Sequence, residues 1–398
     1  MKSTVLPEDR VRALVLERNR KMAESTHAYV RGSTKRFYEW LSQAEHVEIP
    51  SGPAIWICGD CHSGNLGPVA NGDGALAIQI RDLDQAVIGN PAHDLIRLAL
   101  SLAMAARSSD LPGVTTALML ERMIEGYSKA FLTNVDDVSS VMPGTVKALM
   151  RQAAKRSWKH LADESIEGEV RQLPIGPRFW PLTRFERESV DAMFAEQRLE
   201  DLVSALPNIG TGGKVRVVDA AFWRKGCSSL GRLRVAALLV IGKGKNEVYR
   251  LMDIKEAVAP SAPRFPDVVM PIDNGERVVE GARHLSPYLG SRMVATDVLG
   301  KSVFVRELLP QDLKIEIDKL TREEALTVAE YLAHTVGLAH ARQMDSDDRK
   351  SWLAVLKIGP IRKLEAPSWL WASVVDLVAT HEAAYLEHCR RYALVEPA

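Results

Sequence analysis

A short apolar run that ends abruptly in a polar loop restricts the fold of this chain more than any other feature. Residues 54–58 (Ala-Ile-Trp-Ile-Cys) are apolar and β-prone, which predicts a buried strand. Residues 59–65 (Gly-Asp-Cys-His-Ser-Gly-Asn) follow at once and have the composition of a turn. Asp60 and Asn65 therefore lie five residues apart on one loop at the end of a buried strand.

A hairpin after this loop is expected to return the chain to it. Residues 67–70 and 75–80 are β-prone arms around Asn-Gly-Asp-Gly, which is one of the better short-range hairpin signals. The returning arm ends just before Asp82. We therefore expect Asp60, Asn65 and Asp82 to lie close together.

These three residues match the needs of phosphoryl transfer. The reaction requires a carboxylate that accepts the proton of the nucleophile and oxygen ligands that hold Mg²⁺ on the phosphates. Because Mg²⁺ keeps several waters, one Asn and one Asp suffice. Asp60 is the candidate base, Asn65 and Asp82 are the candidate metal ligands, and Asp84 either assists Asp82 or is solvated. His62 is expected to orient the loop by hydrogen bonding. On spacing alone the alternative is an ordinary turn, where Asp, Asn and Gly are common.

The surrounding segment strongly resembles the aminoglycoside and choline phosphotransferase branch of the kinase-like superfamily. That branch has a Gly-Asp-x-His-x-x-Asn loop, then an Asp followed seven residues later by Gly-x-Pro, and then an Asp-Leu. In this chain the corresponding positions are residues 59–65, Asp82, Gly89 and Asp94-Leu95. The resemblance implies that Asp60 is the catalytic base, that Asn65 and Asp82 bind metal, and that Asp94 is a structural clamp. The chain departs from the pattern at Cys58, where these relatives usually carry His.

The other parts of a kinase are a glycine-rich loop, a strand lysine and a helix glutamate, and their candidates follow the catalytic loop in this chain. Residues 226–231 predict a tight turn whose N–H groups can cover phosphates, and its candidate contacts are Gly226, Ser228, Ser229 and Gly231. Lys255 ends a predicted strand. Glu280 on the next helix, with Glu276 as the alternative, is expected to pair with Lys255 and orient it toward the phosphates. Taken singly, the glycine turn is equally typical of an ordinary hairpin. Lys255 and the helix glutamates are equally typical of solvated surface charges.

The whole pattern resembles a bacterial family known only as domain-of-unknown-function family 2252. The matching pieces span most of the chain and include the loop at 59–65, the turn at 226–231, Lys255, and the pair Arg306 and Glu307, which join the candidate nucleotide contacts. In that family the lobe order looks circularly permuted relative to ordinary kinases. The helix at 321–342 would be the one that conventionally leads into the catalytic loop. The family name implies no substrate.

The order of predicted elements indicates an α+β, protein-kinase-like fold with two lobes, circularly permuted. Helical periodicity covers residues 7–44, 91–134, 274–285, 321–342 and 367–391. Strands are expected at 215–221, 232–242, 247–255 and 302–308, with a turn at 243–246. The expected parts are an N-terminal helical extension (1–48), the catalytic-loop segment and helical lobe (49–207), a small antiparallel β lobe with one helix (208–310), and C-terminal helices that complete the helical lobe (311–398). ATP with Mg²⁺ is expected between the lobes, with adenine near residues 304–308.

Charge and hydropathy limit the partners. Lys plus Arg equals Asp plus Glu, at 51 each, which argues against broad electrostatic binding to nucleic acid or to an anionic membrane. No apolar run approaches the length of a bilayer span, and the N-terminus lacks the apolar core of a secretory signal. Four cysteines in 398 residues favour a reducing cytoplasm. The expected partners are a nucleotide and an acceptor that the sequence does not name.

Two other classes of function compete with a phosphotransferase. One is a pseudokinase, a nucleotide-binding or regulatory module without transfer activity, and a related variant transfers the nucleotidyl group instead. The other follows from residues 58–62, which match the Cys-x-x-Cys-His pattern of covalent haem attachment, or from zinc held by Cys58, Cys61 and His62. The apolar strand before them is expected to bury Cys58, which disfavours haem, and zinc lacks a second Cys or His pair at ligand spacing.

Overall fold

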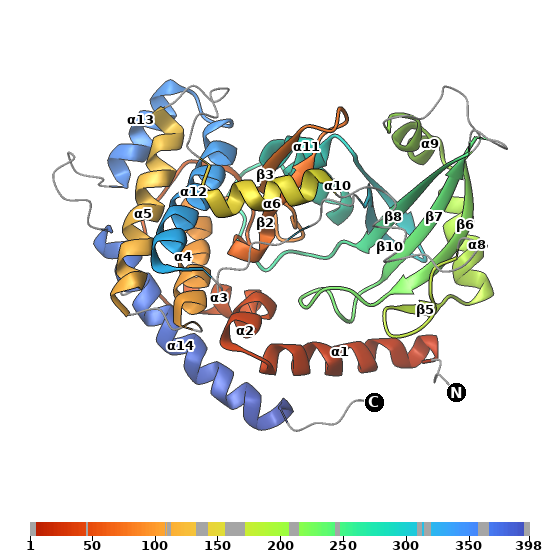
Figure 1. Ribbon diagram of the computed structural model, residues 1–398, viewed down its shortest axis with the longest axis horizontal. Helices are drawn as coiled ribbons and strands as arrows, with labels where there is room; N and C mark the ends of the chain where they lie inside the picture. Colours follow the sequence, from red (N-terminus) through yellow and green to blue (C-terminus); the bar gives the residue numbers. More distant parts are fainter. Residues whose placement is uncertain are drawn as a thin grey trace.

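A computed structural model of the chain describes residues 5–44, 47–107, 109, 113–132, 142–155, 172–206, 215–242, 247–308, 313, 320–356 and 366–393. Within these residues the chain is mixed α+β and its sheets are antiparallel, as predicted. Helices gather at one end of the molecule and a six-stranded sheet stands at the other (Figure 1). The predicted turn at 243–246 and the predicted boundary at residue 208 lie outside the described residues.

The N-terminal part, predicted to be helical, forms three helices: α1 (Pro7–Ala23), α2 (Thr26–Gly32) and α3 (Thr34–Leu41). Helix α1 runs along the base of the molecule from the six-stranded sheet to the C-terminal helix (Figure 1). Near its start, Arg10 forms an ion pair of 2.7 Å with Glu186. Just after its end, Glu24 is followed by Ser25, whose hydroxyl accepts the Ala28 N–H and so starts α2.

The strand, the polar loop and the hairpin that were predicted within residues 54–80 all form. Strand β1 (Ile55–Ile57) pairs with β4 (Val87–Gly89), and a 3-10 turn, η1 (Ser63–Asn65), leads into the hairpin of β2 (Leu66–Ala70) and β3 (Leu76–Ile80). Asn71 closes the hairpin, because its Oδ1 accepts the N–H groups of Asp73 and Ala75. The first hairpin pair, Leu66 with Ile80, brings the chain back to the loop.

The helical lobe is assembled from both halves of the chain. Its helices are α4 (Pro91–Arg107), α5 (Gly113–Leu132), α6 (Gly144–Lys155), α12 (Arg322–Ala341), α13 (Ser346–Val355) and α14 (Ser368–Tyr392). Helix α12 packs along α5 although about 200 residues separate them, and α4 packs against α5 and α14. None of the described helices combines the length and the apolarity that a membrane crossing requires.

The small lobe is built on a six-stranded sheet with the order β5-β6-β7-β8-β10-β9. Its strands are β5 (Phe179–Pro181), β6 (Val215–Trp223), β7 (Arg234–Ile241), β8 (Val248–Glu256), β9 (Met293–Val298) and β10 (Lys301–Glu307). The predicted helix forms as α10 (Asn274–Leu285) between β8 and β9, and is followed by the short α11 (Pro287–Gly290). Strands β4, β5 and β9 were not predicted. Helices α8 (Arg184–Met193) and α9 (Gln197–Ser204) pack in the same apolar core as this sheet.

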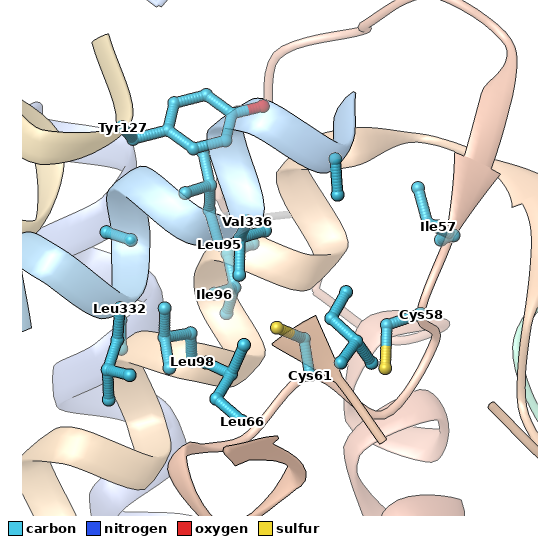
Figure 2. Close-up of a cluster of buried hydrophobic side chains, with 14 of the residues drawn as sticks. Ile57, Cys58, Cys61, Leu66, Leu95, Ile96, Leu98, Tyr127, Leu332 and Val336 are labelled. Atoms are coloured by element: carbon cyan, nitrogen blue, oxygen red, sulfur yellow. The ribbon is translucent and has the colours of Figure 1, made fainter. Parts of the chain in front are cut away.

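The described residues form two large apolar cores, and the larger one also takes in α10 and Phe304 of the small lobe. The larger one includes most buried residues of α4, α5 and α12 together with β1 and the loop after it. Figure 2 shows Cys58, Cys61 and Leu66 lying among Leu95, Leu98, Leu332 and Val336. Burying a side chain such as Leu95 contributes about 1.5–3 kcal/mol. The polar loop is therefore anchored by Cys58, Cys61 and Leu66, which lie next to Asp60 and Asn65 in the sequence.

Candidate active site

The start of the catalytic loop is held by one buried carboxylate. Asp94, which is fully buried at the first turn of α4, accepts the N–H groups of Cys58 at 2.7 Å and Gly59 at 2.9 Å. Gly59 has a φ of +70°, and a Cβ there would lie 2.2 Å from the backbone oxygen of Gln85. Tyr38 Oη donates to the Gly59 carbonyl at 2.5 Å. The loop therefore leaves β1 in one fixed direction.

Asp94 is itself supported by a chain of buried polar groups. His340 Nε2 on α12 lies 3.2 Å from an Asp94 carboxylate oxygen, and its Nδ1 lies 2.9 Å from Tyr127 Oη on α5. Trp352 Nε1 on α13 donates to the same Oη at 3.0 Å. Three helices thus fix the position of Asp94. Sequence analysis missed these supporting residues, because their spacing along the chain gives no local signal.

Asp60, the candidate base, is buried and paired with an arginine. Arg97 Nε donates to its Oδ1 at 2.9 Å, and Arg97 Nη2 donates to the Val30 carbonyl at 2.6 Å. Burial raises the pKa of Asp60 above its usual range, and the Arg97 charge partly opposes this rise. Arg97 was not proposed from the sequence, although a charged residue inside the most apolar stretch of the chain was a usable signal.

His62 does not make the hydrogen bond that was expected of it. Its Nε2 lies 3.9 Å from Asp60 Oδ2, beyond hydrogen-bonding distance. Its Nδ1 is buried without a hydrogen-bond partner among the described residues. Burial and the nearby Arg31 charge hold the pKa of His62 well below its usual range, so the ring is neutral at pH 7. His62 packs beside Asp60, and Arg97 is the residue that orients the Asp60 carboxylate.

Asn65 joins the two halves of the site. Its Nδ2 donates to the Asp60 carbonyl at 2.9 Å and approaches the Asp82 carbonyl at 3.5 Å. The Arg81 N–H donates to the Asn65 carbonyl at 2.8 Å, which continues the β2–β3 pairing up to the site. Because the Asn65 amide nitrogen points at the carbonyls of Asp60 and Asp82, its Oδ1 faces away from them and can accept a hydrogen bond or bind a cation.

Lys255 of β8 reaches across to two carboxylates. Its Nζ lies 2.9 Å from Asp82 Oδ1 and 2.8 Å from Asp84 Oδ2. Burial opposes the charge of Asp82, but Lys255 outweighs it and holds the pKa of this carboxyl below its usual range. Burial and the Asp82 charge raise the pKa of Asp84. Asp84 Oδ1 is buried and has no hydrogen-bond donor in the described part of the chain. Arg232 also lies 3.7 Å from Asp84 Oδ2, so two cations face these carboxylates and Asp84 Oδ1 is left as an acceptor.

A cavity of about 210 Å³ lies over these groups. Asp60, Asn65, Asp82 and Asp84 all line it, together with Ser228 of the predicted glycine turn. The other lining residues are Arg18, Gly32, Thr34, Lys35, Gln85, Arg232 and Ser261. The structure therefore brings the catalytic-loop residues and the turn to one cavity, with α1 and α2 at its mouth.

The turn between β6 and β7 has the backbone that was predicted from its glycines. Gly226 and Gly231 have φ values of +98° and +99°, which only glycine adopts without strain. Ser229 turns inward, and its hydroxyl donates to the Lys225 carbonyl at 3.2 Å. A Cβ on Gly32 of α2 would come within 3.2 Å of the Cys227 sulfur. The tip of the turn thus packs on α2, and Ser228 is its member that faces the cavity.

Arg306 and Glu307 support the site from within the sheet and do not line the cavity. Arg306 lies 3.3 Å from Asp253, whose carboxylate also receives two short bonds from Arg234, at 2.8 and 2.7 Å. Arg306 Nη1 donates to the Arg81 carbonyl at 3.0 Å, next to Asp82. Glu307 is buried between the guanidinium groups of Arg250, at 3.0 Å, and Arg292, at 3.3 Å. Phe304 and Leu308, expected near adenine, are buried in apolar clusters.

The expected pair of Lys255 and Glu280 is absent from the described structure. Glu280 Oε2 contacts Arg283 at 3.0 Å and its Oε1 contacts His284 at 3.3 Å. Glu276, the alternative, lies 3.9 Å from Arg198. Arg277 is the α10 residue that reaches the site segment, because it donates to the carbonyls of Ala86, Asp84 and Val258. The rotation of α10 therefore presents a guanidinium to the backbone around Asp84.

The comparison with protein families matches nearly the whole chain. A model described as "Uncharacterized protein conserved in bacteria (DUF2252)" covers residues 10–391. The chain belongs to the DUF2252 family. No curated protein and no solved structure matched it. This membership agrees with the resemblance seen in the sequence, and it adds no substrate.

The residues of this DUF2252 chain fit a small, hard cation. Asp82, Asp84 and Asn65 offer carboxylate and amide oxygens on one cavity, and the undonated Asp84 Oδ1 is a ready acceptor. Mg²⁺ is bound through one or two carboxylates with several waters retained. The described residues contain no group of three or more His, Cys, Asp or Glu placed to hold a metal.

The Cys-x-x-Cys-His segment is poorly suited to haem or zinc. Cys58 and Cys61 are both fully buried in the larger apolar core (Figure 2), and Cys58 Sγ lies 3.6 Å from the Asp82 carbonyl. The pKa of the Cys58 thiol is raised well above its usual range by its contact with Cys61 and by burial. Zinc needs several such ligands converging on one point, and no group of three among the described residues provides them. The segment instead packs the loop against α4.

Proposed function

We propose that this chain is a Mg-ATP-dependent phosphotransferase with a protein-kinase-like, circularly permuted fold. The observation that carries the proposal is the position of Lys255. A lysine of the small-lobe sheet lies within 3 Å of Asp82 and Asp84, on a cavity that Asp60 and Asn65 also line. A strand lysine, a metal-binding aspartate, a catalytic aspartate and an asparagine are the set that kinases use.

The order of parts in the small lobe supports the same proposal. A glycine turn between β6 and β7, Lys255 on β8 and then α10 follow the kinase order of glycine loop, lysine strand and helix. The catalytic loop precedes these parts in the sequence, and α12 packs beside α5 in the same lobe. A circular permutation accounts for this order, since chain termini at a surface can be joined and reopened without disturbing a core.

Each residue receives one role. Asp60 accepts the proton of an acceptor hydroxyl, whose oxygen bonds to the γ-phosphorus while the bond from that phosphorus to the β–γ bridging oxygen breaks and ADP leaves. Arg97 holds Asp60 toward the cavity. Asn65, Asp82 and Asp84 would hold Mg²⁺, and the bound ion would neutralise charge on the phosphates. Lys255 offers its ammonium to phosphate oxygens.

The size of the cavity limits which part of the nucleotide it receives. About 210 Å³ is below the range of about 300–1,000 Å³ typical of ligand pockets, and it suits the phosphate end. Adenine requires the lobes to separate, since Phe304 and Leu308 are buried. Opening and closing of lobes around a nucleotide is a usual step in phosphotransferases.

Thermal unfolding with and without Mg-ATP tests the nucleotide site. At about 100 times its dissociation constant, Mg-ATP should raise the free energy of unfolding by about 2.7 kcal/mol. Asp82→Asn should remove the Mg²⁺-dependent part of this gain. Asp347→Asn is the matched control, because the Asp347 side chain is 87% exposed and distant from the cavity lining. Equal Mg-ATP stabilisation of the wild type and Asp82→Asn would contradict the proposal.

A nucleotide-binding module without transfer is the second candidate, and one observation favours it. Active protein kinases require the pair of strand lysine and helix glutamate, whereas Glu280 pairs with Arg283 and His284 here. Single-turnover assays with ATP labelled at the γ-phosphate or at the α-phosphate separate the options. Transfer of the γ label that Asp60→Ala abolishes supports the phosphotransferase, transfer of the α label indicates nucleotidyl transfer, and binding without release of either label indicates the module.

A further inference from the structure

A second and larger cavity adjoins the candidate active site. Its volume is about 640 Å³, and it lies between the C-terminal half of α1, helices α2 and α3, and the end of α14. Arg18, Gly32 and Lys35 line both cavities. The two cavities are therefore neighbours, and Asp60 lines the smaller one.

Positive charge dominates the lining of the larger cavity. Arg18, Lys35, Arg36 and Arg391 line it, against the single carboxylate of Glu387. Glu387 pairs with Arg391 at 2.8 Å and also with Arg390, at 3.7 Å, and Lys35 approaches Glu39 at 3.7 Å.

Two of these cations have no counter-ion in the described part of the chain. The guanidinium groups of Arg18 and Arg36 form no ion pair and no hydrogen bond with a described residue. Glu387 is already shared by two arginines, so the cavity carries net positive charge. A cluster of this kind, including unpaired guanidinium groups, is suited to a phosphate or carboxylate.

The remaining wall is apolar and aromatic. Met22, Tyr29 and Tyr392 line the cavity with two alanines of α14. The ring of His388 lies 5.3 Å from that of Tyr29 and 4.7 Å from that of Tyr392, between centroids and with both pairs tilted, so the three rings are neighbours. A volume of this size with a few convergent charges on an apolar wall is typical of a site for a small organic ligand.

We propose that this cavity binds the acceptor, and that the acceptor is a small hydroxyl compound carrying an anionic group, a phosphate or a carboxylate. The anionic group is held by Arg18, Arg36 and Arg391, and the hydroxyl reaches Asp60 past Gly32 and Lys35. The substrate assignment rests on the proposed phosphotransfer, whereas the anion site itself does not require it.

Anion binding in the absence of nucleotide tests the site. Inorganic phosphate, glycerol 3-phosphate and glycerate are titrated by calorimetry against glycerol, which lacks the anionic group. The charge reversals Arg36→Glu and Arg391→Glu are compared with Arg390→Glu, whose side chain is 82% exposed and which does not line the cavity. The phosphate and carboxylate probes separately identify the favoured anion.

The expected result is binding of the anions, no binding of glycerol, and affinities that fall about tenfold or more in Arg36→Glu and Arg391→Glu but not in Arg390→Glu. Failure of every anion to bind the wild type, or equal loss in all three variants, would overturn the proposal. Loss of Mg-ATP binding in Arg36→Glu would also overturn the proposal, because the larger cavity would then bind the nucleotide and not the acceptor. If anions bind as expected but Asp82→Asn leaves Mg-ATP binding unchanged, the anion site stands and the phosphotransferase fails.

Discussion

Replacing Asp94 with asparagine is the most direct test of how the catalytic loop is held. The wild-type carboxylate is fully buried and accepts two backbone N–H groups, at 2.7 and 2.9 Å, while His340 lies at 3.2 Å. An asparagine of nearly the same shape has one acceptor oxygen, so one of the Cys58 and Gly59 N–H groups would face an amide NH₂ instead.

The magnitude follows from these contacts. A hydrogen bond to a charged group is worth about 1.5–3 kcal/mol, and a buried donor without an acceptor adds a desolvation cost of about 1–3 kcal/mol. Since asparagine keeps one of the two bonds, Asp94→Asn should lower the free energy of unfolding by about 2.5–6 kcal/mol. Asp94→Ala, which removes both acceptors, should cost more.

Urea unfolding at pH 7.5 measures this change. The midpoint should fall while the slope stays constant, because the surface exposed on unfolding is unchanged. Asp347→Asn, at an exposed position, should change the free energy of unfolding by less than about 0.5 kcal/mol. If the free energy of unfolding of Asp94→Asn lies within about 0.5 kcal/mol of the wild-type value, the idea that Asp94 holds the loop is refuted.

Three further changes test other parts of the fold. Burial holds the pKa of His381 at about 4, against 6.5 for an ordinary histidine. Between these two pH values the unfolded state binds more protons than the folded state, so the free energy of unfolding should fall by up to about 1.4 kcal/mol per pH unit as the pH drops from 6.5 to 4. His381→Leu should reduce that slope in urea titrations. Gly59→Ala should cost more than about 2 kcal/mol through its φ of +70° and the backbone clash, whereas Gly72→Ala, with open space around it, should be nearly neutral; equal effects in thermal unfolding would contradict this. Arg234→Ala leaves the buried Asp253 with weaker partners and should cost about 3–5 kcal/mol by denaturant unfolding, and a loss below about 1 kcal/mol would show that this ion pair is not structural.

Much of the site was predictable because its signals are local. The strand before the loop, the hairpin around Asn71 and helix α10 follow from alternation, turn chemistry and helical periodicity within short windows. The short hairpin also explains why Asp82 could be expected near Asp60, since few residues separate them and the turn fixes their direction. The structure has both on one cavity.

The partner of Lys255 was predicted wrongly for a physical reason. A helix turns about 100° per residue, so the residue that faces the site depends on how the whole helix is rotated. Val278, Val279, Ala282 and Leu285 of α10 are buried in the core, and their packing sets that rotation. Periodicity finds the helix but not the surface against which its apolar face packs.

The sequence by itself determined the loop, its three polar residues, the hairpin and most of the strands and helices, because neighbouring residues encode them. Only the tertiary structure decided that Arg97 holds Asp60, that Lys255 faces Asp82 and Asp84, and that α1, α3 and α14 enclose a basic cavity beside them. Those contacts join residues tens to hundreds of positions apart. They form because each helix and strand must bury its apolar face against another, and that packing places polar groups that no local pattern connects.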